Sequence, residues 1–135
     1  MAARHRTRDA RLNRLSEICL ALPETTRKDG HDYASFLVRT RPFAYFLNDH
    51  HGDGIVSVAC KALPGDNMSL AAAQPERFYL PAYIGPRGWI ALRLDAKKVD
   101  WEEVSELVEA SYRLIAPRRL QQRVGVRTGK PARGA

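Results

Sequence analysis

Apolar residues recur at helical spacing in two segments, one near each end of the chain. In the first segment the recurring residues are Leu12, Leu15, Ile18, Cys19 and Leu22. In the second segment they are Trp101, Val104, Leu107, Val108, Ser111 and Ile115. A stripe with this period predicts an amphipathic helix that buries one face. Proline ends both runs, at Pro23 and Pro117, because its ring cannot continue the helical backbone.

Between these two helices the apolar pattern is that of strands. Three short apolar runs are separated by turn residues, and they span residues 33–38, 43–47 and 55–60. Short connections of this kind predict an antiparallel three-stranded meander. After Gly88 the side chains of residues 89–94 alternate between two faces, which is typical of a half-buried strand. Pro81 and Pro86 make the segment before Gly88 irregular, or at most an edge strand.

The remaining segments complete the expected order of elements. Residues 24–30 are polar and are expected to be a connection, whereas the alanine-rich residues 67–74 predict a short helix. Asp100 is a suitable N-cap for the last helix, and Glu103 would complete a capping box. The predicted fold class is α+β, a twisted antiparallel sheet with helices packed on one side, in the order α-β-β-β-α-β(β)-α.

The net charge of +7 is concentrated at the two ends of the chain. Residues 1–11 carry four arginines and one aspartate, and residues 117–135 carry six basic groups and no acid. Residues 12–116 carry 12 basic and 14 acidic groups, so this part is slightly acidic. We therefore predict one domain over residues 12–116, a basic N-terminal tail, and a basic C-terminal tail that is disordered for want of a periodic apolar pattern. Such tails hold polyanions loosely or simply keep a protein in solution.

Cys19 and Cys60 both lie inside apolar patterns and are expected to be buried, reduced thiols. The chain has no zinc-ligand spacing, no apolar run long enough to span a membrane and no apolar region of a signal peptide. The cytoplasm is therefore the expected compartment. No phosphate-binding loop, nucleophile elbow or other catalytic signature is present, so we expect no catalytic residue, metal or cofactor.

Two clusters of acidic or histidine residues contain side chains that can bind a metal ion. Asp49, His50, His51 and Asp53 lie in one turn. Adjacent histidines in a turn rarely converge on one ion, and a solvated turn is the favoured interpretation. Glu102, Glu106 and Glu109 share one face of the last helix. A solvated helix face is again favoured over an acidic ridge that binds metal.

A set of residues along the chain carries a family resemblance. In order, these are Leu22-Pro23-Glu24, Gly30-His31, Phe36, Phe43-Ala44, Lys61, Phe78, Pro81-Ala82-Tyr83, Gly88-Trp89, Leu92, Trp101, Leu107 and Ser111-Tyr112. Over about residues 12–116 this set resembles the MmcQ/YjbR family, although many relatives have His-Pro where this chain has His31-Asp32. The resemblance implies a fold like that of the bacterial frataxin homologue and the secretion chaperones. It implies no established activity; DNA binding has been proposed for the family by analogy of fold.

Two partner hypotheses follow, and the oligomeric state stays open. In the first, the protein is a non-catalytic module that binds nucleic acid (DNA) through basic side chains; the candidates are Arg27, Lys28, Arg39, Arg41, Arg118, Arg119, Arg123 and Arg127. In the alternative, a small ligand or a protein partner occupies a cleft near the segment from Pro81 to Trp89; the candidates are His31, Lys61, Tyr83, Arg87 and Trp89. The competing interpretations are that His31 only pins its loop and that Lys61 only packs its stem on Trp89.

Overall fold

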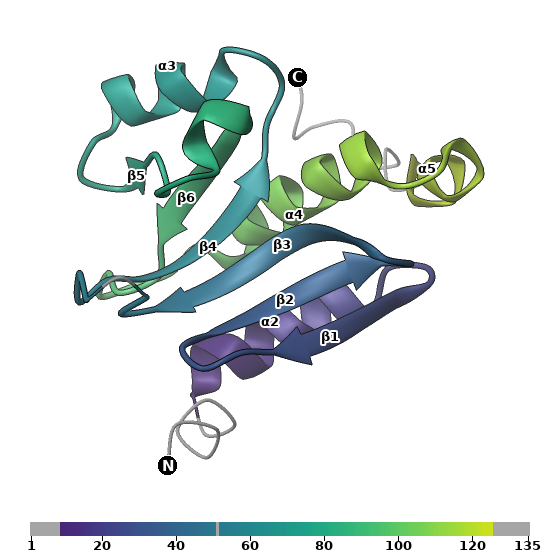
Figure 1. The fold of residues 1–135 in the computed structure, drawn as a ribbon, viewed down its shortest axis with the longest axis horizontal. Coiled ribbons are helices and arrows are strands. Elements are labelled where there is room, and N and C mark those ends of the chain that lie inside the picture. Colours follow the sequence, from purple (N-terminus) through teal and green to yellow (C-terminus); the bar gives the residue numbers. More distant parts are fainter. Residues whose placement is uncertain (1–8, 51, 126–135) are drawn as a thin grey trace.

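The computed structural model describes residues 9–50 and 52–125, and six antiparallel strands form one open sheet in it (Figure 1). Their order across the sheet is β1-β2-β3-β4-β6-β5. The strands are β1 (Thr25–Asp29), β2 (Tyr33–Val38), β3 (Arg41–Asn48), β4 (Val56–Lys61), β5 (Phe78–Tyr79) and β6 (Trp89–Arg93). The predicted α+β fold class and the central meander β2-β3-β4 are confirmed.

The helices of the described residues are α2 (Ala10–Leu20), α3 (Asp66–Ala73), α4 (Trp101–Ile115) and α5 (Arg118–Gly125), with a 3₁₀ turn η1 (Gly85–Arg87). Helices α2 and α4 lie against one face of the sheet, while α3 and η1 gather beside β5 and β6 (Figure 1). Helix α4 begins as predicted, because the Asp100 carboxylate accepts from the backbone N–H groups of Glu102 and Glu103. The Glu103 carboxylate, expected to close a capping box, pairs with Arg77. None of these helices is long and apolar enough to cross a membrane.

The core lies between the sheet and the helices α2 and α4. Opposite residues of an antiparallel ladder share a face. One such row crosses five strands and consists of Ala34, Phe46, Val58, Leu92 and Phe78, each at most 3% exposed. Leu12 and Leu15 of α2 and Val104 and Val108 of α4 are fully buried as well. Burial of a side chain of this size stabilises the fold by about 1.5–3 kcal/mol, so this layer is the main source of stability.

Strand β1 corrects the expectation of a polar connection over residues 24–30. It pairs with β2 residue by residue, from Thr25 opposite Val38 to Asp29 opposite Ala34. The strand has no apolar residue to reveal it, because it is an edge strand, and charged side chains on an edge discourage pairing with other chains. The Thr25 hydroxyl also donates to the Leu22 carbonyl at 2.9 Å, which joins the strand to the end of α2.

Helix α5 corrects the expectation of disorder directly after Pro117. Leu120 and Val124, one turn apart, are 1% and 5% exposed and belong to the core. In the sequence these two residues stand among polar neighbours, so they do not form a recognisable apolar period. The expected disorder of residues 126–135, and the candidate Arg127 among them, lie outside the described residues.

Two further expectations about α4 and β6 change in detail. Tyr112, absent from the predicted inward stripe, is fully buried, and Glu109, expected to face outward, is only 8% exposed. On β6, Trp89 and Ala91 are buried along with Ile90, so this strand is covered on both faces rather than half-buried. The two cysteines are buried and unpaired, as predicted. Burial raises the pKa of both thiols, which keeps them protonated.

Candidate functional site

The sheet face opposite α2 and α4 carries a groove lined by aromatic residues. Tyr33 lies opposite Leu47 and Ser35 opposite Tyr45 on this face, because residues paired across the ladder point the same way. The groove has a volume of about 650 Å³, and the loop of residues 80–84 forms its other wall. We call this the tyrosine groove; its lining residues are Tyr33, Tyr45, Leu47, His50, Asp53, Ile55, Tyr79, Leu80, Pro81, Ala82, Tyr83 and Ile84.

A buried amide holds the loop over the groove. The Asn67 side chain, 4% exposed, donates to the carbonyls of Gly85 at 2.9 Å and Trp89 at 3.1 Å. Inside the loop, the Gly85 N–H donates to the Pro81 carbonyl at 2.8 Å. Gly85 also approaches Leu80 so closely that an added Cβ would lie 3.2 Å from the Leu80 Cβ. Helix α3 therefore fixes the wall of the groove through one side chain.

Tyr83 stands at the rim of the groove in a strained conformation. Its φ is +69°, in the left-handed region that bulky residues avoid, and its side chain is 83% exposed. A non-glycine residue held there costs about 1–3 kcal/mol, and so exposed a ring gains little from burial to offset that cost. Strain of this kind clusters at ligand-binding sites, which makes Tyr83 the strongest single indication of function.

A histidine–aspartate pair closes one end of the groove. His50 Nδ1 lies 2.5 Å from Asp32 Oδ1, and the Tyr33 ring meets the His50 ring edge-on at 5.4 Å. Partial burial of Asp32 opposes its ionisation, but the hydrogen bond and charge of His50, helped by the charge of His31, outweigh it and lower the pKa of Asp32. The pair orients the imidazole against Tyr33 and so shapes this end of the groove.

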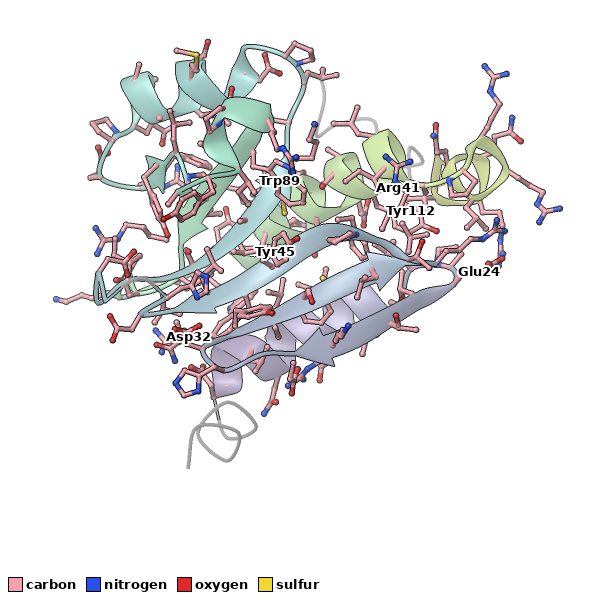
Figure 2. The ribbon with its side chains drawn as sticks, in the orientation of Figure 1. Glu24, Asp32, Arg41, Tyr45, Trp89 and Tyr112 are labelled. Atoms are coloured by element: carbon pink, nitrogen blue, oxygen red, sulfur yellow. The ribbon has the colours of Figure 1, made fainter. Side chains whose placement is uncertain are left out.

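Two tyrosines form the floor. Tyr45 packs against Trp89 with ring centroids 5.3 Å apart, and the two lie next to each other in Figure 2. The Tyr79 hydroxyl lies 2.8 Å from the Ser57 hydroxyl. Burial is the largest cause that raises the pKa of both Tyr45 and Tyr79, so their phenols stay neutral well above pH 7. The floor is thus aromatic surface with neutral hydroxyl groups.

The residues predicted for a cleft near Pro81–Trp89 do not meet in one place. Tyr83 lines the tyrosine groove, and Trp89 lies behind its floor. Lys61 and Arg87 line a second cavity of about 530 Å³, where Lys61 Nζ donates to the Arg87 carbonyl at 2.7 Å. His31 is exposed and is not among the residues that line either cavity.

The basic candidates fall into two groups. On β1, Arg27 pairs with Asp29 at 2.7 Å and donates to the Ser16 hydroxyl at 2.9 Å, and Lys28 is exposed. At the opposite end of that strand, basic side chains from the β2–β3 turn and from α5 converge, and we call this group the arginine end. Its members are Arg39, Arg41, Arg118, Arg119 and Arg123.

One carboxylate lies within the arginine end. Arg39 Nε contacts Glu24 Oε1 at 2.9 Å, and this hydrogen bond is the main cause that lowers the pKa of Glu24. The charges of Arg119 and Arg123 act on Glu24 in the same direction, so α5 lies close to it. Arg41 Nη1 donates to the Ile115 carbonyl at the end of α4, 3.4 Å away, and Figure 2 shows Arg41 and Glu24 at this end of the molecule.

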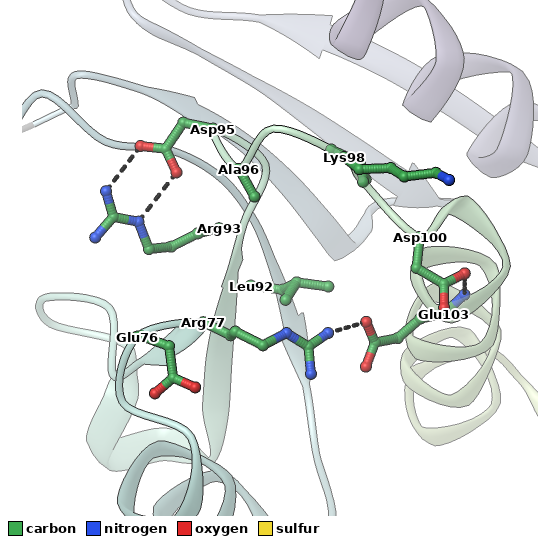
Figure 3. Close-up of a pocket in the computed structure, with 10 residues that line it drawn as sticks. Glu76, Arg77, Leu92, Arg93, Asp95, Ala96, Lys98, Asp100 and Glu103 are labelled. Carbon is green, nitrogen blue, oxygen red and sulfur yellow. Dashed lines mark hydrogen bonds and ion pairs between the residues drawn. The ribbon is translucent and has the colours of Figure 1, made fainter.

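A smaller charged cleft of about 250 Å³ lies between β5, β6 and the start of α4 (Figure 3). Its charges largely neutralise each other, because Arg93 pairs with Asp95 at 2.9 Å and Arg77 pairs with Glu103. One pair joins Arg77, just before β5, to α4, and the other joins Arg93 of β6 to the loop that follows, which is a structural role. Among the described residues, no three His, Cys, Asp or Glu side chains gather as a metal site would require.

Sequence reasoning missed most of the residues that form the groove. Tyr33, Tyr45 and Leu47 are large side chains on the sheet face that turns away from the helices, and the strand period could have revealed them. Asn67 and Asp32 gave no such signal, because their roles depend on segments far apart in the chain.

Comparison with known proteins identifies the fold. The YjbR family model matches residues 20–114. A crystal structure of the Deinococcus radiodurans protein DR2400, with a DUF419 domain, is similar at 22% sequence identity and a TM-score of 0.62. The similarity covers 82% of this chain and 85% of that one, and at this identity it shows the fold alone. No curated protein matches the sequence.

Proposed function

The chain belongs to the YjbR family, and we propose that it is a non-catalytic binding protein whose ligand occupies the tyrosine groove. The observation that carries this proposal is Tyr83, strained and exposed beside a 650 Å³ groove. Ligand sites have volumes of about 300–1,000 Å³ and combine apolar walls with a few polar groups. The groove has this composition, so its ligand is a small molecule with an apolar body.

The rigidity of the walls supports binding further. Asn67 holds the loop side, and the His50–Asp32 pair holds the opposite end. A wall that is already ordered loses little entropy when a ligand enters, which raises affinity for a given area of contact.

Phenol, used as a neutral aromatic probe at millimolar concentration, tests this proposal. Titration of the ¹⁵N-labelled protein is expected to shift the backbone amide signals of Leu47, Ile55 and Ala82. A Tyr45→Ala/Tyr83→Ala variant should lose most of these shifts, whereas Leu114→Ala, which removes an exposed side chain from α4, should keep them. Shifts that are absent from the groove, or unchanged in the double variant, would refute the proposal.

A second candidate function is the binding of nucleic acid (DNA), and the arginine end favours it. Arg39, Arg119 and Arg123, from two distant segments, act on one glutamate there, so positive charge exceeds negative charge in this patch. Phosphate contacts by arginine release counterions and produce a steep dependence of affinity on salt. Arg27, bound to Asp29 and Ser16, is less available for such contacts.

This candidate is tested with two variants that remove the same charge. In Arg119→Gln/Arg123→Gln the arginine end loses two positive groups, and in Lys97→Gln/Lys98→Gln an exposed pair elsewhere is lost. If the arginine end binds duplex DNA, the slope of log affinity against log salt falls by about two units only in the first variant. Equal slopes in both variants would refute it. Deletion of residues 117–135 is a poorer test, because α5 is part of the core.

A further inference from the structure

The charges around the tyrosine groove are unevenly distributed. None of the lining residues is a lysine or an arginine, and one, Asp53, is a carboxylate. Asp53 lies close enough to Tyr79 for its charge to help raise the pKa of that phenol, after burial. The basic ring in the lining, His50, already pairs with the Asp32 carboxylate, its Nδ1 lying 2.5 Å from Asp32 Oδ1. An anionic ligand would therefore lose its hydration and compete with that carboxylate for positive charge, which is strongly unfavourable.

Aromatic rings offer a cation a surface of negative potential. The face of a tyrosine ring carries negative potential, and cations placed over such faces are attracted, most of all when water is excluded. The groove presents four tyrosines from three separate parts of the sheet and its loop: Tyr33, Tyr45, Tyr79 and Tyr83. The Asp53 carboxylate adds a full negative charge at one side of the same groove.

The two arginines whose charges act on the groove tyrosines, Arg93 and Arg87, do not reverse this balance. Arg93 is held by both carboxylate oxygens of Asp95, at 3.0 and 2.9 Å. Arg87 lines the second cavity with Lys61, and its charge only partly opposes the burial that raises the pKa of Tyr45. Both arginines thus lie outside the lining.

We infer that the tyrosine groove selects an organic cation, a small molecule with an ammonium group on an apolar body. This rests on the proposed function, because it names the chemical class of the ligand for the same groove. The volume of about 650 Å³ suits a free small molecule, which can lie within the groove, better than a single side chain of a protein.

A matched pair of probes isolates the charge. Choline and 3,3-dimethylbutan-1-ol have nearly the same shape and differ in a quaternary nitrogen against a carbon. In ¹⁵N-observed titrations choline is expected to bind about tenfold more tightly at the groove amides. Equal or tighter binding of the neutral alcohol would overturn the inference and leave the proposed function standing. Absence of groove shifts with both probes would overturn the inference, and the phenol titration would then decide the proposed function separately.

Two variants of one turn provide the second measurement. Asp53→Asn removes the lining carboxylate but keeps an oxygen that can accept from the Ile55 N–H, as Asp53 does at 2.9 Å. Asp49→Asn makes the same charge change at a residue that binds the Gly54 N–H and is not among the lining residues. Asp53→Asn should weaken the binding of choline severalfold and leave the binding of the alcohol unchanged. Asp49→Asn should weaken the binding of choline less. Equal effects would overturn the inference, as would binding of a trimethyl-lysine peptide in the absence of choline binding.

Discussion

The hydroxyl of Tyr112 donates to the carbonyl of Pro23 across 2.6 Å, and this bond joins two segments 89 residues apart. Pro23 follows α2, and Tyr112 lies near the end of α4 with its ring edge-on to Phe43 at 5.3 Å. A single side chain therefore ties the first helix, the last large helix and the sheet together.

Replacement of Tyr112 by phenylalanine tests this tie. Tyr112→Phe keeps the ring and removes one hydrogen bond, so the free energy of unfolding should fall by about 1–2 kcal/mol. Urea denaturation measures the change. Tyr33→Phe, which removes a phenolic hydroxyl from the groove face, serves as the control and should lower the free energy of unfolding less. Equal losses in both variants would show that the bond to Pro23 contributes nothing of its own.

Ser111 satisfies two backbone groups of neighbouring strands. Its hydroxyl donates to the Phe43 carbonyl at 2.6 Å and accepts from the Lys61 N–H at 2.9 Å. Ser111→Ala leaves both groups unsatisfied in a buried place, so we expect a loss of about 2–3 kcal/mol in unfolding free energy. Ser105→Ala, on the same helix, should lose less than about 0.5 kcal/mol. A loss at Ser111 as small as at Ser105 would contradict this account.

Helix α5 should stabilise the domain through Leu120. Leu120→Ala removes a side chain that is 1% exposed, and we expect a loss of about 2–4 kcal/mol and a lower thermal midpoint. Gln122→Ala, on the exposed side of the same helix, should change the midpoint little. If both variants have the same thermal midpoint as the wild type, α5 does not pack against the core in solution.

Three tyrosines, Tyr112 fully buried and Tyr45 and Tyr79 half-buried, predict how stability depends on high pH. Burial is the largest cause that raises the pKa of Tyr45, Tyr79 and Tyr112. Because the folded state favours the neutral phenol, this stabilisation is complete below the ordinary tyrosine pKa of about 10 and is lost as the pH rises through the raised values. Absorbance titration of phenolate should therefore show three tyrosines that ionise later than in the denatured protein. Ionisation of all five at the denatured midpoint would contradict the prediction.

The elements that the sequence predicts are those whose buried side chains recur at helix or strand spacing. The sequence predicts β2 over the residues it occupies and the capping of α4 by Asp100, because both depend on neighbours in the chain. β1 could not be predicted from apolar pattern, since an edge strand of Thr, Arg, Lys and Asp looks like a loop. α5 was missed because only Leu120 and Val124 mark its buried side.

The groove was harder to predict than the fold. The sequence indicates Tyr83 as a cleft residue, but it gives no means to separate Tyr83 from Lys61 and Arg87, which line another cavity. Which side chains share a hollow depends on strand register and on how the loop is anchored by Asn67, and neither is a local property of the sequence.

The contact between Trp89 and Tyr45 gives the molecule an internal optical reporter. Trp89 is 8% exposed, and its ring lies 5.3 Å from a tyrosine that lines the groove. The chain has one other tryptophan, Trp101, which lies under the Arg14 guanidinium at the start of α4. In a Trp101→Phe protein the intrinsic tryptophan emission would come from Trp89 alone, so filling or emptying the groove could be followed by the wavelength and intensity of that emission without any attached dye.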